Sequence, residues 1–177
     1  DRVMLATVFW DGGAGTNSWQ DKNNWSTDTL PGPGDDVVIS VQDDPTVTFT
    51  AGQATVASIS TNESFSISGG SLSVTGDLGV AAGPFTVGGG TLSVAGMFGL
   101  SNTELRYNAG TLSASPNLTG GTLKLGGGAS PVTFILGGTG SMTGNIGAGQ
   151  TVWIRGSSFS ANASITATGP FTNAGTI

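Results

Sequence analysis

The sequence predicts an all-β fold: a right-handed parallel β-helix with coils of about 20 residues and three short strands per coil. First, "GGSLSVTG" at 69–76 returns as "GGTLSVAG" at 89–96 and, more weakly, as "AGTLSAS" at 109–115. Second, apolar and polar residues alternate within each copy, which is typical of a strand with one buried face. Third, glycines separate the alternating runs and permit the sharp corners that a coil requires.

Aligning the three copies predicts which side chains stack inside the solenoid. The inward columns are expected to be Phe65, Phe85 and Leu105; Ile67, Val87 and Tyr107; Leu72, Leu92 and Leu112; Val74, Val94 and Ala114; and Leu78, Phe98 and Leu118. The outward columns are expected to be Ser71, Thr91 and Thr111, and Ser73, Ser93 and Ser113. After Thr119 the spacing loosens, although the alternation persists. A helical repeat would need about 33 residues or more, so a β-solenoid is favoured.

The chain divides into a Trp-rich cap at 1–36 and β-helix coils at 37–177. A β-helix has an open edge at each end, and such an edge pairs with other chains unless it is covered. Trp10, Trp19 and Trp25 are suited to cover the first edge, and we expect all three indoles to be buried against the first coil. "GPFTNAGT" at 169–176 echoes "GPFTVGGGT" at 83–91, which predicts that a new coil begins there and that the natural protein continues.

Composition excludes several functions. The net charge is -6 and only five cations are present, so no basic patch for nucleic acid can form. No apolar run approaches the roughly 20 residues that span a bilayer, so no membrane insertion is expected within this chain. The absence of His removes the commonest general base, and the absence of Cys removes disulfides and thiolate metal sites.

The segment "FWDGGAGTNSWQDKNNWSTDTLPGPGDDVVI" resembles the N-terminal entry motif of large secreted or surface bacterial parallel β-helix proteins, including autotransporter passengers and adhesins. The shared pattern is Trp-x-Gly, a second Trp, Asn-Trp, a Pro-Gly turn and Gly-Asp-Asp-Val. "DRVMLA" is similar to the tail of an export-associated motif of very large exported bacterial proteins. These resemblances imply an extracellular or cell-surface location and a role in adhesion or envelope structure.

Calcium is the one metal for which the sequence offers candidate ligands. "GGAGTN" at 12–17 partly matches the calcium-binding pattern Gly-Gly-x-Gly-x-Asp, with Asn where Asp is needed. The candidate ligands are Asp11, Asn17, Asp35, Asp36, Asp43 and Asp44. A single partial copy is more typical of a turn, and the Asp pairs are typical of turn caps and exposed loops. The sequence therefore predicts no cofactor, with calcium as the alternative.

Polysaccharide lyases and hydrolases also use parallel β-helices, so enzymatic activity is the main alternative to a structural role. Such sites need clustered carboxylates, whereas neighbours on one strand point to opposite faces. Glu104 and Arg106 lie on one side of a strand and are expected to pair. Trp153 is expected to point outward beside Arg155, and this pair is the candidate for contact with a carbohydrate.

The sequence therefore predicts a non-catalytic structural or adhesive segment of an exported bacterial surface protein: a rigid β-helical stalk or passenger. The alternatives are a polysaccharide lyase or hydrolase and a calcium-dependent carbohydrate-binding β-helix. The partners to consider are a cell-surface polysaccharide and another copy of the chain, bound through the end of the β-helix.

Overall fold

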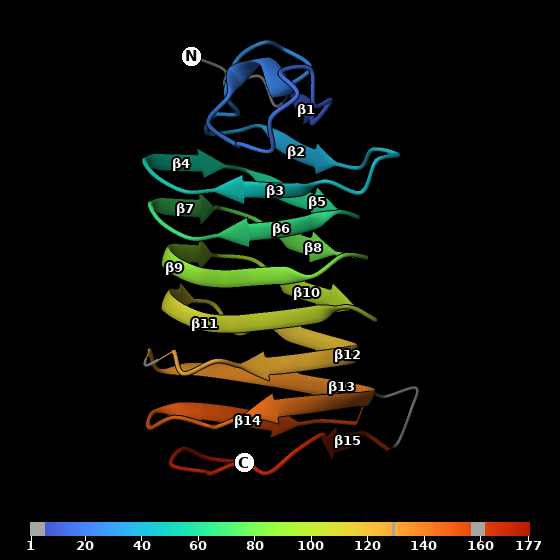
Figure 1. The fold of residues 1–177 in the computed structure, drawn as a ribbon, viewed down its shortest axis with the longest axis vertical. Coiled ribbons are helices and arrows are strands. Elements are labelled where there is room, and N and C mark those ends of the chain that lie inside the picture. Colours follow the sequence, from blue (N-terminus) through green and yellow to red (C-terminus); the bar gives the residue numbers. More distant parts are fainter. Residues whose placement is uncertain (1–5, 129, 157–161) are drawn as a thin grey trace.

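A computed structural model describes residues 6–128, 130–156 and 162–177 as an all-β parallel solenoid with coils of about 19 residues. The coils stack along one axis, with the N-terminal segment at one end and the C-terminus at the other (Figure 1). Helical structure in the described ranges is a single 3-10 turn, Lys22–Asn24. No helix within those ranges is long and apolar enough to cross a membrane.

The strands form three hydrogen-bonded ladders that run along the solenoid. The strands are β1 (Thr7–Phe9), β2 (Asp36–Ile39), β3 (Thr46–Phe49), β4 (Gln53–Val56), β5 (Ser58–Thr61), β6 (Ser64–Ile67), β7 (Ser71–Val74), β8 (Leu78–Val80), β9 (Phe85–Val94), β10 (Phe98–Ser101), β11 (Glu104–Ser113), β12 (Asn117–Leu125), β13 (Val132–Gly144), β14 (Gln150–Ile154) and β15 (Ser164–Ala167). The first ladder contains β1, β2, β5, β8, β10 and the start of β12. The second contains β3, β6, the starts of β9 and β11 and the end of β12. The third contains β4, β7 and the ends of β9 and β11. Because β9 and β11 turn a corner without ending, each contributes to two ladders.

The register confirms most of the predicted columns. Phe65 pairs with Phe85 and Phe85 with Leu105, in two steps of 20 residues. The predicted pairs in the columns of Ile67, Leu72 and Ser71 are confirmed in the same way. Three short strands per coil are therefore the correct interpretation of the repeat.

One predicted column is wrong at its last member. Leu118 was aligned with Phe98, but it pairs with Leu100, because the step between these coils is 18 residues and not 20. The chain turns quickly after Ser113, so the buried Pro116 takes the inward position that corresponds to Phe98. In the later echo, Phe171 does not stand in the column of Phe85, because Ala167 of β15 takes that place. Phe171 lies four residues further on and is partly exposed. The start of a new coil there stays a prediction.

The core is one continuous apolar cluster that begins in the cap and runs through the coils. Aromatic rings follow one another along it, with centroid distances of 4.7 Å for Trp25–Trp19, 5.7 Å for Trp19–Phe65, 5.5 Å for Phe65–Phe85 and 5.2 Å for Phe85–Phe98. Most of these pairs meet edge to face, the arrangement that aromatic rings favour. The cap and the first coils therefore share one core.

Glycine is required where corners of successive coils touch. At the corner inside β9, Gly90 has φ +65°, and a Cβ there would lie 2.5 Å from the carbonyl oxygen of Gly70. A side chain at this position would meet both a strained backbone conformation and the backbone of the preceding coil. The repeated Gly-Gly pairs therefore set how closely the coils stack.

The cap covers two of the three ladders. On the first ladder, β1 pairs with β2. On the second, the amide of Trp19 donates to the carbonyl of Thr48 at 2.9 Å, and the amide of Thr48 donates to the carbonyl of Asn17 at 2.7 Å. On the third, β4 pairs only with β7 in the described part of the chain, and a cavity of about 450 Å³ lies between β4 and the Pro-Gly turn at 30–33.

The third ladder is interrupted once within the solenoid. The end of β11 pairs with β9, but no described strand pairs with it on the C-terminal side. The next coil brings Pro131 to this junction, and Pro has no amide hydrogen to donate. A cavity of about 390 Å³ lies there, and the hydroxyl of Ser130, next to Pro131 in the sequence, donates to the carbonyl of Gly110 at 3.0 Å. The loosened spacing after Thr119 therefore corresponds to a real irregularity, although β13 and β14 pair with each other in the next coil.

Candidate functional site

The Trp-rich segment is part of the core, as the sequence predicts. Trp10, Trp19 and Trp25 are 3%, 1% and 0% exposed. Trp25 meets Trp10 edge to face at 5.0 Å, and its indole N–H donates to the carbonyl of Trp19 at 2.9 Å. These indoles do not line an open aromatic cleft for a sugar, so the segment caps the solenoid.

The loop that partly matches a calcium motif is organised by a buried amide. Asn24 is fully buried, and its Oδ1 accepts the amide of Ala14 at 3.1 Å. Its Nδ2 donates to the carbonyl oxygens of Thr16 and Ser18 at 3.0 and 3.1 Å. Asn24 thus holds the loop together from its buried side and occupies two of the carbonyl oxygens that the loop could offer to an ion. Asn24 is not among the sequence-predicted site residues, and its position next to Trp25 is the one signal that could have found it.

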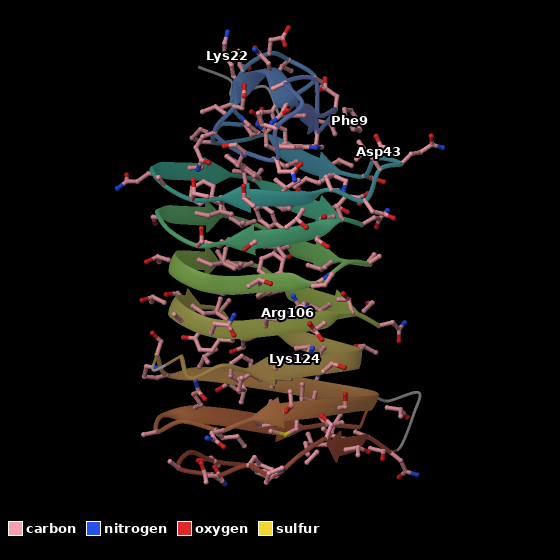
Figure 2. All side chains as sticks on the ribbon, viewed as in Figure 1. Phe9, Lys22, Asp43, Arg106 and Lys124 are labelled. Atoms are coloured by element: carbon pink, nitrogen blue, oxygen red, sulfur yellow. The ribbon has the colours of Figure 1, made fainter. Side chains whose placement is uncertain are left out.

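Two of the acidic calcium candidates accept hydrogen bonds from backbone amides in turns. Asp11 Oδ1 accepts the amide of Gly13 at 2.9 Å, and Asp35 Oδ2 accepts the amide of Gly32 at 2.8 Å. Asp36, at the start of β2, accepts the hydroxyl of Ser58. Asp43 and Asp44 are exposed on the loop after β2, which projects from the body (Figure 2).

Three calcium candidates approach one another in the structure. Asp11, Asn17 and Asp43 line a cavity of about 190 Å³ beside the cap. A calcium ion takes six to eight oxygen ligands, usually including several carboxylates. Within the ranges that the structure describes, no group of three or more Asp, Glu, His or Cys side chains is placed to hold a metal. The carboxylates that line this cavity are those of Asp11 and Asp43.

A charged cluster lies on the outer face of the second ladder. Glu104 pairs with Arg106 on its own strand, as predicted, and also with Lys124 on the next coil at 2.6 Å. Figure 2 shows Arg106 and Lys124 one above the other on this face, in agreement with their register. Burial alone would raise the pKa of Glu104, but the hydrogen bonds and charges of Lys124 and Arg106 together lower it below its ordinary value. An ionised carboxylate held by two cations is poorly suited to act as a general acid.

The Trp153–Arg155 pair projects from the last part of the first ladder. Trp153 is 50% exposed, as predicted, and the guanidinium carbon of Arg155 lies 5.4 Å from its ring centroid. This distance is within the range of a cation–π contact. Trp153 pairs with Ile135, and Ile135 with Asn117, so these three positions follow one another on the outer surface.

A groove runs next to this pair. Its volume is about 210 Å³, and it is lined by Asn117, Thr119, Ile135, Gly137, Gly138, Arg155 and Gly156. Gly137 lies between Thr119 and Arg155 on the outer face and has no side chain to fill the space. We call this group, with Trp153, the Trp153–Arg155 groove. The pair is predictable from the alternation, but the groove is not, because it depends on which residues of three separate coils become neighbours.

The groove and Trp153 together present an apolar ring, a guanidinium, an amide and a hydroxyl. The described residues that line the groove include no Asp or Glu. No protein family, curated protein or solved structure matches the chain. Its function is therefore inferred from the geometry above.

Proposed function

We propose that the chain is a non-catalytic structural and adhesive segment of an exported bacterial surface protein: a rigid rod that displays a carbohydrate-contacting face. One observation carries the proposal. The apolar core continues from the buried Trp25 through the stacked coils to Val152, while the outer faces are covered by short polar side chains. This arrangement supports a stiff rod with a repetitive surface.

The distribution of carboxylates supports a non-catalytic role. A glycosidase needs two carboxyl groups about 5 to 9.5 Å apart, one of them with a raised pKa. On the outer surface of the coils, Glu104 is paired with two cations and its pKa is lowered. The resemblance of the cap segment to surface β-helix proteins favours the same interpretation.

The proposal is tested by two measurements on the whole chain. Hydrogen exchange should show strong protection of the backbone amides in the strands from β2 to β13, because the hydrogen bonds of a rigid rod open rarely. Incubation with neutral and acidic polysaccharides should release no new reducing ends and no unsaturated products. Turnover that disappears in Glu104→Gln but persists in Asp43→Asn, a change in an exposed loop carboxylate, would overturn the non-catalytic role.

A further inference from the structure

Charge is segregated along the rod. All 11 Asp and Glu residues lie at or before Glu104, and the charged side chains after it are Arg106, Lys124 and Arg155. The formal charge is therefore -9 for residues 1–104 and +3 for residues 105–177, which together give the net -6. An acidic protein thus carries a positively charged C-terminal half. The positive charge of this half attracts an anionic ligand over about a Debye length, which is roughly 8 Å at physiological salt.

The three cations of this half are not equivalent. Arg106 and Lys124 share Glu104 on the second ladder. Arg155 lies on the first ladder beside the groove and forms no ion pair with a described residue. No Asp or Glu follows Glu104 in the sequence, so the coils after Glu104 place no Asp or Glu side chain beside Arg155. Its guanidinium is held over Trp153 and remains exposed.

The groove and Trp153 bring an aromatic ring and hydrogen-bonding side chains onto one face, at a separation that matches the length of a short sugar chain. The exposed ring of Trp153 offers an apolar surface of the kind on which a pyranose ring packs. Asn117 and Thr119 lie two coils away on the same face, with the space above Gly137 between Thr119 and Arg155. Neighbouring strands are about 4.8 Å apart, so two coils span roughly the length of two sugar units.

We propose that the Trp153–Arg155 groove binds a uronic acid residue of an acidic polysaccharide. The carboxylate accepts hydrogen bonds from the guanidinium of Arg155, whose planar fork matches a carboxylate. The sugar ring packs on Trp153, and ring hydroxyls of the chain bond to Asn117 and Thr119. This inference rests on the proposed adhesive function and names its ligand class.

The test is calorimetric titration of the whole chain with oligogalacturonate and with its methyl ester, which keeps the sugar rings but removes the charge. We expect the acid form to bind at least about tenfold more tightly, because the ester cannot form the charge-assisted pair with Arg155. Raising the salt concentration should weaken binding of the acid form and leave the ester unaffected. A sulfated neutral glycan of the same length tells whether the groove prefers a carboxylate or accepts any anion.

Variants assign the binding to the groove. Trp153→Ala and Arg155→Gln should each weaken binding of the acid form by about tenfold or more. Gly137→Leu should also weaken it by filling the groove, since a Cβ on Gly137 makes only ordinary contacts, the nearest at 3.4 Å. Lys124→Gln removes one positive charge of the same half on another face and is the matched control, with a loss of less than about twofold expected. Melting curves of all variants report whether the fold is intact.

Each other outcome contradicts a defined part of the inference. Equal binding of acid and ester, or stronger binding of the sulfated glycan, would overturn the uronic acid. Equal losses in Lys124→Gln and Arg155→Gln would overturn the groove and indicate diffuse charge attraction. No binding by the wild-type chain would overturn the ligand site, whereas the structural role would still be judged by hydrogen exchange and turnover.

Discussion

Replacing Trp25 by Ala should destabilise the chain more than replacing Trp153, the tryptophan near the C-terminal end, by Ala. Trp25 is fully buried between Trp10 and Trp19, at centroid distances of 5.0 and 4.7 Å. Truncation of a buried Trp costs about 3–5 kcal/mol in free energy of unfolding. It also ends two aromatic contacts and leaves the carbonyl of Trp19 without its indole donor. We therefore expect a loss near the upper end of that range.

The Phe variants separate the hydrogen bond from the packing. Trp25→Phe keeps an aromatic ring but removes the donor to Trp19, which costs about 1–3 kcal/mol when the acceptor is buried. The indole nitrogen of Trp19 is buried without a hydrogen-bond partner in the described structure. Trp19→Phe should therefore cost less than Trp25→Phe, although both remove the same atoms.

The assay is urea unfolding followed by far-ultraviolet circular dichroism, together with hydrogen exchange of the amides of β2 and β3 next to the cap. Trp153→Ala is the matched control. Its side chain is half exposed, so its cost should be about half of that of Trp25→Ala or less. If Trp25→Ala costs no more than Trp153→Ala, the buried tryptophans do not stabilise the end of the solenoid and the cap interpretation is wrong.

Three further predictions follow from the corners, the charged cluster and the acidic loops. Gly90→Ala should cost about 1–3 kcal/mol in urea unfolding, because of its positive φ and its contact with Gly70. Gly79→Ala, with open space around it, should cost less than about 1 kcal/mol, and equal costs would contradict the corner argument. Because the pKa of Glu104 is lowered in the folded state, its ionised form stabilises the fold at neutral pH. This contribution should be lost as the pH falls below the ordinary Glu pKa of about 4.3, so the melting temperatures of wild type and Glu104→Gln should converge there. A difference that does not change with pH would contradict the role of the ion pairs. Melting curves in calcium chloride and in EDTA should coincide, because Asn24 already donates to loop carbonyl oxygens of the partial calcium motif. A higher melting temperature in calcium would instead indicate a site at Asp11, Asn17 and Asp43.

The sequence predicted the coils because their geometry is local. Alternation identifies the inward residues of a strand, and a repeat spacing identifies their partners on the next coil, as for Phe65 and Phe85. The prediction for Leu118 failed because it assumed a constant coil length. A corner can shorten by two residues without disturbing the ladders, and alternation alone does not record such a change.

The candidate site was predictable only in part. The outward orientation of Trp153 followed from alternation, and the pairing of Glu104 with Arg106 followed from their positions on one strand. The third member, Lys124, and the groove above Gly137 are made by residues of successive coils after the irregular step. Their positions depend on corner lengths, so they became visible only with the register.

The interrupted third ladder has a consequence for mechanical load. A pull along the axis of the rod is resisted by hydrogen bonds between successive coils, and these act in parallel across the ladders. In the described structure, the junction between β11 and β13 lacks the strand pairing of the third ladder and has the hydroxyl of Ser130 in its place. We therefore expect this junction to open under load before the junction between β9 and β11, which is paired on both ladders.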